Sequence, residues 1–154
     1  MRLAVTRIPG AHAVPLPTHQ TEGSAGLDLV AESFDVGGMR AAELDLEPGD
    51  RVLARTGISI AIPPGHAGLV CPRSGLALRH GLGVVNGPGV IDADYRGEVG
   101  VILVNHGREP VRLERGMRVA QLVVVPFVRV EISEERDLDA TVRGAGGFGS
   151  TGAG

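Results

Sequence analysis

The sequence predicts an all-β fold, a sandwich, jelly roll or barrel, with one short helix. Short apolar runs, alternating or continuous, recur from end to end of the 154 residues. The 24 glycines and 10 prolines favour many short strands joined by turns over long helices. Aromatic residues make up only 3% of the chain, so the core must be built from Val, Leu, Ile and Ala.

The predicted strands share period-2 alternation or a short apolar run, and they cover residues 3–7, 26–30, 51–54, 58–62, 66–71, 83–85, 98–105, 118–125 and 127–132. Turn residues separate them at 47–50, 63–65, 86–89 and 114–116. Only residues 74–80 indicate a helix, barely two turns long, with Ser74 as its N-cap. The segment 32–42 has no predicted role.

Residues 1–142 are predicted to form one domain, and residues 143–154 a flexible, glycine-rich arm. The entropy cost of ordering so many glycines opposes a strand in the arm.

Composition and charge exclude several classes of partner. The net charge is −3, without the basic stripe of a duplex-DNA binder, so no nucleic-acid partner is expected. No apolar run approaches the roughly 20 residues that span a bilayer, so no membrane contact is expected. The one cysteine, Cys71, cannot form an internal disulfide, and early prolines interrupt any secretory pattern, which predicts a cytoplasmic protein. All 15 basic residues are arginine, which binds phosphate with paired hydrogen bonds.

Two segments carry residues suited to charged ligands. Asp28 stands in an apolar run and needs a cationic or metal-linked partner, unless it caps backbone amides at a strand edge. Arg73 and Ser74 stand where the short helix begins, and the free N–H groups there suit a phosphate. The alternative is a plain N-cap beside a solvated arginine.

The segment 83–98 is the richest in candidate residues. Asn86, followed by glycine, predicts a hairpin tip whose exposed backbone groups can pair with a base edge. Asp92 ends an apolar run, and a carboxylate held there can act as a general base on water. Tyr95, the only tyrosine, can pack against a sugar. The alternatives are an acidic turn and an ordinary half-buried aromatic.

Two further segments are weaker by themselves. Gln121 is the interior polar side chain of an apolar run, and it must find partners if it is buried. The tail carries Arg143, Phe148, Ser150 and Thr151 among glycines whose amides can surround phosphate oxygens. The alternatives are that Gln121 only makes hydrogen bonds within the fold, and that the tail is a loose terminus.

Taken in order, the segments AGLDLVA, PRSGLA, GVIDADYRGEVGV, RVAQLVV and RGAGGFGSTG resemble the five motifs of the trimeric dUTPase family, over about residues 20–152. The resemblance implies a distorted jelly-roll β-barrel of the dUTPase-like β-clip form, and a homotrimer whose sites are shared between subunits. It also implies hydrolysis of dUTP to dUMP and pyrophosphate, which keeps uracil out of DNA and supplies dUMP for thymidylate synthesis.

The resemblance implies roles for single residues. Asp92 orients and activates the water that attacks the α-phosphate, and Tyr95 packs on deoxyribose and excludes a 2′-hydroxyl. Uracil is read by the turn and the strand after it, namely Asn86, Gly89, Val90 and Ile91. The phosphate contacts are Arg73, Ser74, Gly75 and Gln121.

The implied cofactor is Mg²⁺, chelated by the triphosphate and held by Asp28 only through water, with no direct protein ligand. Arg143 balances charge as a second catalytic residue. The arm that closes over the nucleotide includes Phe148, Gly149, Ser150 and Thr151, with Phe148 stacked on the base.

Two other functions are weighed against this one. A dCTP deaminase shares the fold, but it places a catalytic glutamate where this chain has Ile102. A jelly-roll module that binds nucleotides without turnover is the second, and the presence of Asp92, Gln121 and the complete tail argues against it. Ammonia release from dCTP and pyrophosphate release from dUTP would separate the three.

Overall fold

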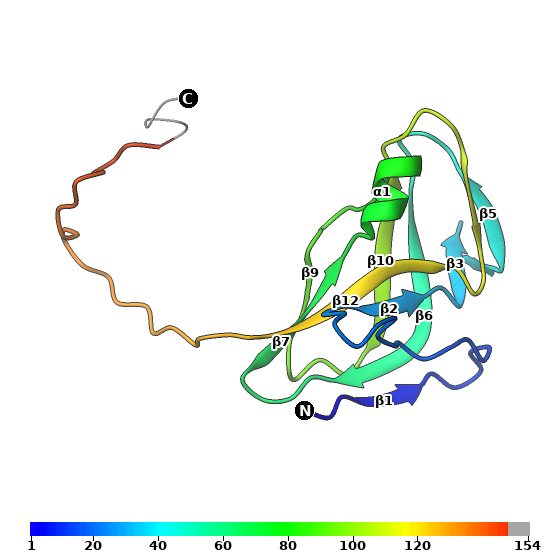
Figure 1. Ribbon diagram of the computed structural model, residues 1–154, viewed down its shortest axis with the longest axis horizontal. Helices are drawn as coiled ribbons and strands as arrows, with labels where there is room; N and C mark the ends of the chain where they lie inside the picture. The colour runs from blue at the N-terminus through cyan, green and yellow to red at the C-terminus, as the bar shows by residue number, and fades with distance from the viewer. Residues whose placement is uncertain (148–154) are drawn as a thin grey trace.

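A computed structural model describes residues 1–147 of the protein, whose regular structure is almost entirely strand (Figure 1). In chain order the elements are β1 (Ala4–Arg7), β2 (Leu27–Val30), β3 (Ser33–Val36), β4 (Met39–Ala41), β5 (Glu43–Leu46), β6 (Arg51–Ala61), β7 (His66–Cys71), α1 (Ser74–His80), β8 (Leu82–Val84), β9 (Gly89–Ile91), β10 (Glu98–Asn105), β11 (Val111–Glu114) and β12 (Arg118–Pro126).

The strands form three antiparallel sheets. The six-stranded sheet has the order β4-β3-β6-β10-β8, with β1 also paired to β6. The four-stranded sheet has the order β2-β12-β7-β9, and β11 pairs separately with β5. The prediction of an all-β, jelly-roll-like fold with one short helix is confirmed, although the sheets of the described part stay open instead of closing into a barrel.

Aliphatic side chains from the two larger sheets meet in one core. In β10, Val101 and Leu103 are buried while Ile102 faces outward, which is the alternation of a strand with one buried face. Leu29 of β2 and Leu122 of β12 join the same cluster from the other sheet. Burial of these side chains therefore fixes how the two sheets face each other.

Long strands match the prediction better than short ones. β7 and β10 have the predicted bounds, whereas residues 51–54 and 58–62 form the single strand β6, which passes through Gly57 at a φ of 68°. The sequence does not predict β3, β4, β5, β9 or β11. Each has only three or four residues, so even the alternation in β3, β5 and β11 is too short to distinguish a strand from a loop. Each is held by hydrogen bonds to a neighbouring strand.

The chain leaves the sheets after β12. Residues 127–147 run away from the body without regular structure, so the strand predicted at 127–132 is wrong for a single chain (Figure 1). Phe127 still donates its amide to the carbonyl oxygen of Gly65 at 3.1 Å. A strand needs a neighbour along its length, and within residues 1–147 no other backbone group of residues 127–132 has one. The domain boundary at residue 142 stays a prediction, and Phe148, Gly149, Ser150 and Thr151 lie outside the described residues.

The helix α1 has the predicted bounds, but its N-cap is Arg73 rather than Ser74, and no side chain caps it. Its C-terminal end is closed by Gly81, whose φ of 68° lets the amide reach the carbonyl oxygens of Leu76 and Ala77. The Ser74 hydroxyl therefore has no capping role.

The turn at residues 85–88 is present, but the predicted hairpin is not. Gly87 donates its amide to the carbonyl oxygen of Val84 at 3.0 Å. The strands on either side do not pair with each other, because β8 pairs with β10 and β9 pairs with β7. The turn therefore carries the chain from one sheet to the other.

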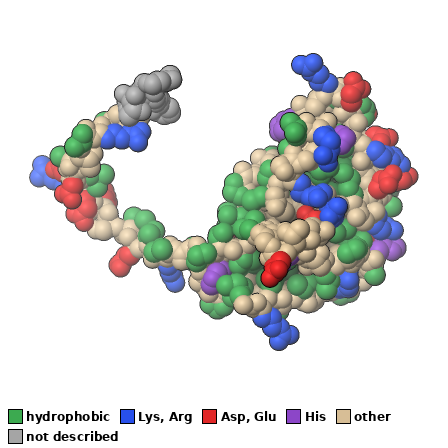
Figure 2. Space-filling view, in the orientation of Figure 1, with side chains coloured by type: hydrophobic (Ala, Val, Ile, Leu, Met, Phe, Trp, Pro, Cys, Tyr) green, Lys and Arg blue, Asp and Glu red, His purple; other side chains and the backbone are tan. Residues whose placement is uncertain are grey.

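The surface mixes basic, acidic and apolar side chains on the face shown in Figure 2, and apolar side chains continue along the segment after β12. On this segment Val128, Val130 and Ile132 are 85%, 69% and 86% exposed. Within residues 1–147, no helix has the length and hydropathy needed to cross a membrane.

Candidate functional site

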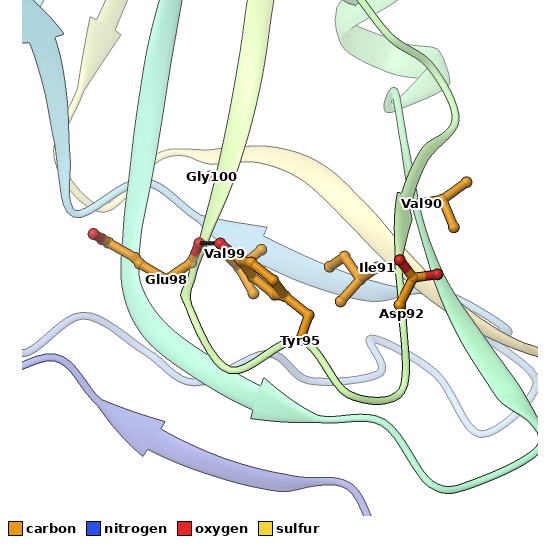
Figure 3. A pocket seen from close by; sticks show the side chains of 7 residues that line it. All are labelled: Val90, Ile91, Asp92, Tyr95, Glu98, Val99 and Gly100. Carbon is orange, nitrogen blue, oxygen red and sulfur yellow. Dashed lines mark hydrogen bonds between the residues drawn. The ribbon is translucent and has the colours of Figure 1, made fainter.

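A first pocket lies at the end of β9, and we name it the Asp92 pocket (Figure 3). Its volume is about 170 Å³ and its lining residues are Val90, Ile91, Asp92, Tyr95, Glu98, Val99 and Gly100. Strand β9 of the four-stranded sheet forms one wall, and β10 of the six-stranded sheet forms the other. Four of the residues named from the sequence thus come together here.

Tyr95 is anchored by backbone groups. Its hydroxyl donates to the carbonyl oxygen of Glu98 at 3.0 Å, and its amide donates to the carbonyl oxygen of Asp92 at 3.2 Å (Figure 3). Gly97 permits this fold-back, because a Cβ there would collide with the Tyr95 hydroxyl. The ring is nevertheless 45% exposed, so it can present a surface to a ligand.

Asp92 is exposed on the wall of this pocket, directly after the buried Ile91. Within residues 1–147 no side chain forms a hydrogen bond or ion pair with its carboxylate. An acid with an anchored backbone and an open carboxylate can bind water and accept a proton from it.

Asn86 packs against the strand that follows its turn. A Cβ at Gly89 would lie 3.1 Å from Asn86 Nδ2, so the buried glycine leaves room for this amide. The side chain of Asn86 therefore lies close to the backbone of β9, the strand that contributes Val90 and Ile91 to the Asp92 pocket.

A second pocket lies where α1 begins, next to β2 and β12, and we name it the Arg73 pocket. Its volume is about 220 Å³ and its lining residues are Gln20, Asp28, Arg73, Ser74, Gly75, Leu76, Arg79 and Gln121. It gathers every phosphate and metal residue that the sequence analysis named outside the tail. The register between β2 and β12 pairs Asp28 with Gln121 directly.

Asp28 has the cationic partners that its burial demands. Its side chain is 11% exposed, with Oδ1 3.1 Å from Arg73 Nε and Oδ2 3.0 Å from Arg118 Nη1. Arg118 Nη1 also donates to Gln20 Oε1 at 2.9 Å. Gln121 is satisfied in part by donating Nε2 to the carbonyl oxygen of Pro72 at 3.0 Å. The carboxylate is thus neutralised and held in one orientation.

Sequence reasoning missed Arg79 in this pocket. Its guanidinium lies over Gly75, since a Cβ at that glycine would be 3.0 Å from Arg79 Nη2. The spacing of four residues on one helix is a local signal that could have found it. Gln20 and Arg118 carry no such signal, because they reach the pocket from distant parts of the chain.

A model of the dUTPase family matches residues 12–152. The chain belongs to the dUTPase family. It is 57% identical over 137 residues to the deoxyuridine 5'-triphosphate nucleotidohydrolase of Anaeromyxobacter sp. (strain Fw109-5), covering 89% of this chain and 87% of that protein. It is 50% identical to the protein of the same name from Methylocella silvestris, over 99% of this chain and 92% of that protein.

The fold agrees with this family. A solved structure of Staphylococcus bacteriophage 80alpha dUTPase with dUPNHPP matches with a TM-score of 0.84 at 25% identity, covering 99% of both chains.

The two pockets of this dUTPase share no lining residue. Arg143, the other residue named as catalytic, lies in neither pocket. It stands on the segment that leaves the body and donates Nε to the carbonyl oxygen of Gly146 at 2.8 Å.

The residues of the Arg73 pocket fit the Mg²⁺ that dUTPases generally use. Within residues 1–147 no three His, Cys, Asp or Glu side chains gather as a metal cage. The carboxylate of Asp28 uses one contact per oxygen for arginine, which leaves lone pairs for the waters of a hydrated ion. Mg²⁺ commonly keeps several waters and combines one carboxylate with substrate phosphates.

Proposed function

We propose that this chain hydrolyses dUTP to dUMP and pyrophosphate by attack of a water, activated by Asp92, on the α-phosphate. The proposal rests on Asp92 and Tyr95 lining one pocket in a chain 57% identical to a deoxyuridine 5'-triphosphate nucleotidohydrolase. Such an enzyme keeps uracil out of DNA and supplies dUMP for thymidylate synthesis.

Asp92 orients the water and accepts its proton, as the water oxygen bonds to phosphorus and the bond to pyrophosphate breaks. The open carboxylate supports this role. Tyr95 packs on deoxyribose, where a 2′-hydroxyl would clash. The turn that contains Asn86 reads uracil together with the backbone of Gly89, Val90 and Ile91.

The phosphate chain is bound by Arg73, Ser74, Gly75 and Gln121. In support, these residues line one polar pocket, and the hydroxyl of Ser74 has no capping role. Asp28 would hold Mg²⁺ through water beside the triphosphate, and the bound ion would supply positive charge to the phosphate oxygens.

Residues 143–154 close over the nucleotide in this proposal. Arg143 absorbs the charge that develops on pyrophosphate, while Phe148 stacks on the base and Gly149, Ser150 and Thr151 contact the phosphates. Closure excludes bulk water from the reaction.

We infer that the enzyme is a C3 homotrimer whose sites each combine pockets from different subunits. The separation of the two pockets within one chain supports this arrangement. So do apolar side chains left exposed by one chain, Val85 and Ile102 on the six-stranded sheet side and Val128 after β12. The single cysteine, Cys71, has no disulfide partner, which accords with the cytoplasmic location that we propose.

The test is pyrophosphate release from dUTP with and without Mg²⁺, run beside dCTP, dTTP and UTP. We expect rapid, Mg²⁺-dependent turnover of dUTP only, because the methyl of dTTP and the 2′-hydroxyl of UTP clash with a tight pocket. Ammonia release from dCTP, or binding of dUTP without turnover, would instead identify one of the two alternative functions.

A further inference from the structure

An ion-pair network adjoins the Asp92 pocket and takes no part in the proposed chemistry. Arg55 of β6 donates Nε and Nη2 to the two oxygens of Asp35 at 2.7 and 2.8 Å, and Nη1 to Glu98 Oε2 at 2.8 Å. Arg40 adds longer contacts, 3.7 Å to Glu98 Oε2 and 3.8 Å to Glu32 Oε2. Arginines from β4 and β6 thus converge on Glu98, which lines the pocket, and Asp35 of β3 joins the network through Arg55.

The side chain of Glu98 also accepts a hydrogen bond at a point where the backbone pairing between β10 and β6 is interrupted. The register between β10 and β6 shifts between Glu98 and Gly100. At this point Glu98 Oε1 accepts the amide of Gly57 at 2.9 Å, and the buried Thr56 Oγ1 donates to the carbonyl oxygen of Val99 at 2.6 Å. Irregularities of this kind occur beside functional sites, where they redirect side chains.

The backbone of Glu98 in turn anchors the ring of Tyr95. Its carbonyl oxygen accepts the Tyr95 hydroxyl, while its side chain points away from the ring toward the network (Figure 3). Without Arg55, the carboxylates of Asp35 and Glu98, which are 29% and 12% exposed, would keep only Arg40 as a nearby cation, although Glu98 would still accept the Gly57 amide. Their desolvation and mutual repulsion would then displace residue 98 and the ring attached to it.

We propose that Arg55 is a positioning residue of the sugar subsite, acting through Glu98 to fix Tyr95 and so setting how strongly the pocket rejects ribonucleotides. This inference rests on the proposed function, in which Tyr95 packs on deoxyribose. It also gives a role to the segment 32–42, which contributes Asp35 and Arg40.

A first test measures, without substrate, how firmly the side chain of Tyr95 is held. Tyr95 is the only tyrosine and the chain has no tryptophan, so tyrosine fluorescence reports on this side chain alone. In full-length Arg55→Met, which keeps an apolar stem, we expect quenching by uncharged acrylamide to rise about twofold and fluorescence anisotropy to fall.

Arg112→Met is the matched control. Arg112 also contacts three carboxylates, those of Glu43, Asp45 and Glu114, but on the separate sheet of β5 and β11, and it lines neither pocket. We expect this variant to leave both the quenching and the anisotropy of Tyr95 at wild-type values.

A second test measures the selectivity of the enzyme for dUTP over UTP. In Arg55→Met, the ratio of kcat/KM for UTP to that for dUTP should rise about tenfold, with KM for dUTP raised more than kcat is lowered. Arg55→Lys keeps the charge and should recover part of the ratio. If Arg55 acts through Glu98, its effect on the ratio should not add to that of Glu98→Gln in the double variant.

A folded Arg55→Met protein with unchanged quenching and an unchanged substrate ratio would overturn the inference. If that variant does not fold, Arg55→Lys carries the same comparison, with smaller expected shifts in the same direction. A wild-type protein that does not hydrolyse dUTP would overturn the proposed function instead, and acrylamide quenching would still decide whether Arg55 positions Tyr95.

Discussion

Asp92 and Tyr95 lie three residues apart on the turn between β9 and β10, and they are fixed in different ways. The ring of Tyr95 is tied by its hydroxyl to the backbone, whereas the carboxylate of Asp92 is left open to water. A group that packs on a sugar needs a fixed position, and a group that binds water needs access. The turn provides both within one pocket.

Asp92→Asn preserves the size of the side chain and removes its basicity. We expect dUTP to bind with a Kd within about threefold of the wild type, while kcat falls at least about a hundredfold. Calorimetry with a non-hydrolysable analogue and pyrophosphate release would measure the two effects. Asp94→Asn, an exposed acid that lines neither pocket, is the matched control, and near-normal turnover in Asp92→Asn would remove Asp92 from the role of base.

The sequence predicted which residues line the two pockets better than it predicted what holds them in place. Asp28 was expected to have a cation, but Arg118, one of its two partners, is 90 positions away in the chain. Glu98 and Arg55 are 43 positions apart, and no local pattern connects them. Such partners depend on sheet topology, which a single sequence does not specify.

At the level of elements, the short strands β3 and β4 form the antiparallel pair that carries Asp35 and Arg40. The alternation in β3 covers only four residues and β4 has only three, so neither pattern distinguishes a strand from a loop. The longer β7 and β10 repeat their alternation often enough to be recognised. The residues that support the site therefore stand on the elements that were hardest to predict.

Two carboxylates near this strand pair make stability depend on pH. Hydrogen bonds from Arg55 lower the pKa of Asp35 below its ordinary value of 3.8, against the opposing effect of burial. Burial alone would raise the pKa of Glu32, but hydrogen bonds from Ser33 and the His12 amide, with nearby arginines, bring it below 4.5. Because both values are lowered by folding, these groups stabilise the protein fully above their ordinary values and lose that contribution as the pH falls through the folded values.

We therefore expect the thermal midpoint of unfolding to fall progressively as the pH is lowered below about 4.5. Asp35→Asn should lower the midpoint at neutral pH and reduce its dependence on acid. Asp45→Asn is the control, since the ion pair of Asp45 with Arg112 is exposed and contributes little. Calorimetry across this range would measure the midpoints, and the same acid dependence in Asp35→Asn and the wild type would contradict the assignment.

At the level of the whole molecule, one chain presents two separate pockets and a segment that leaves the body after residue 126. The proposed trimer would bring pockets of neighbouring chains together and supply the third part of each site from residues 143–154. Assembly and catalysis then depend on different lengths of the same C-terminal segment.

Truncation after Val142 separates these two dependences. It removes Arg143 but keeps the apolar residues just after β12, so we expect a trimer by analytical ultracentrifugation and a kcat reduced at least about a hundredfold. Truncation after Pro126 removes the apolar residues as well and should also shift sedimentation toward smaller species. An unchanged kcat after truncation at Val142 would show residues 143–154 to be dispensable.

Residues 128–132 have the pattern of an edge strand without a sheet. Apolar side chains are exposed at positions 128, 130 and 132, and within residues 1–147 the backbone groups of this segment have no hydrogen-bond partner. A subunit dissociated from the proposed trimer would expose this segment to other chains, and exposed strand edges are sites of aggregation. Dilution during purification should therefore promote precipitation or proteolysis before the fold itself melts. If the protein is the proposed trimer, its lifetime in solution will depend on concentration as well as on temperature.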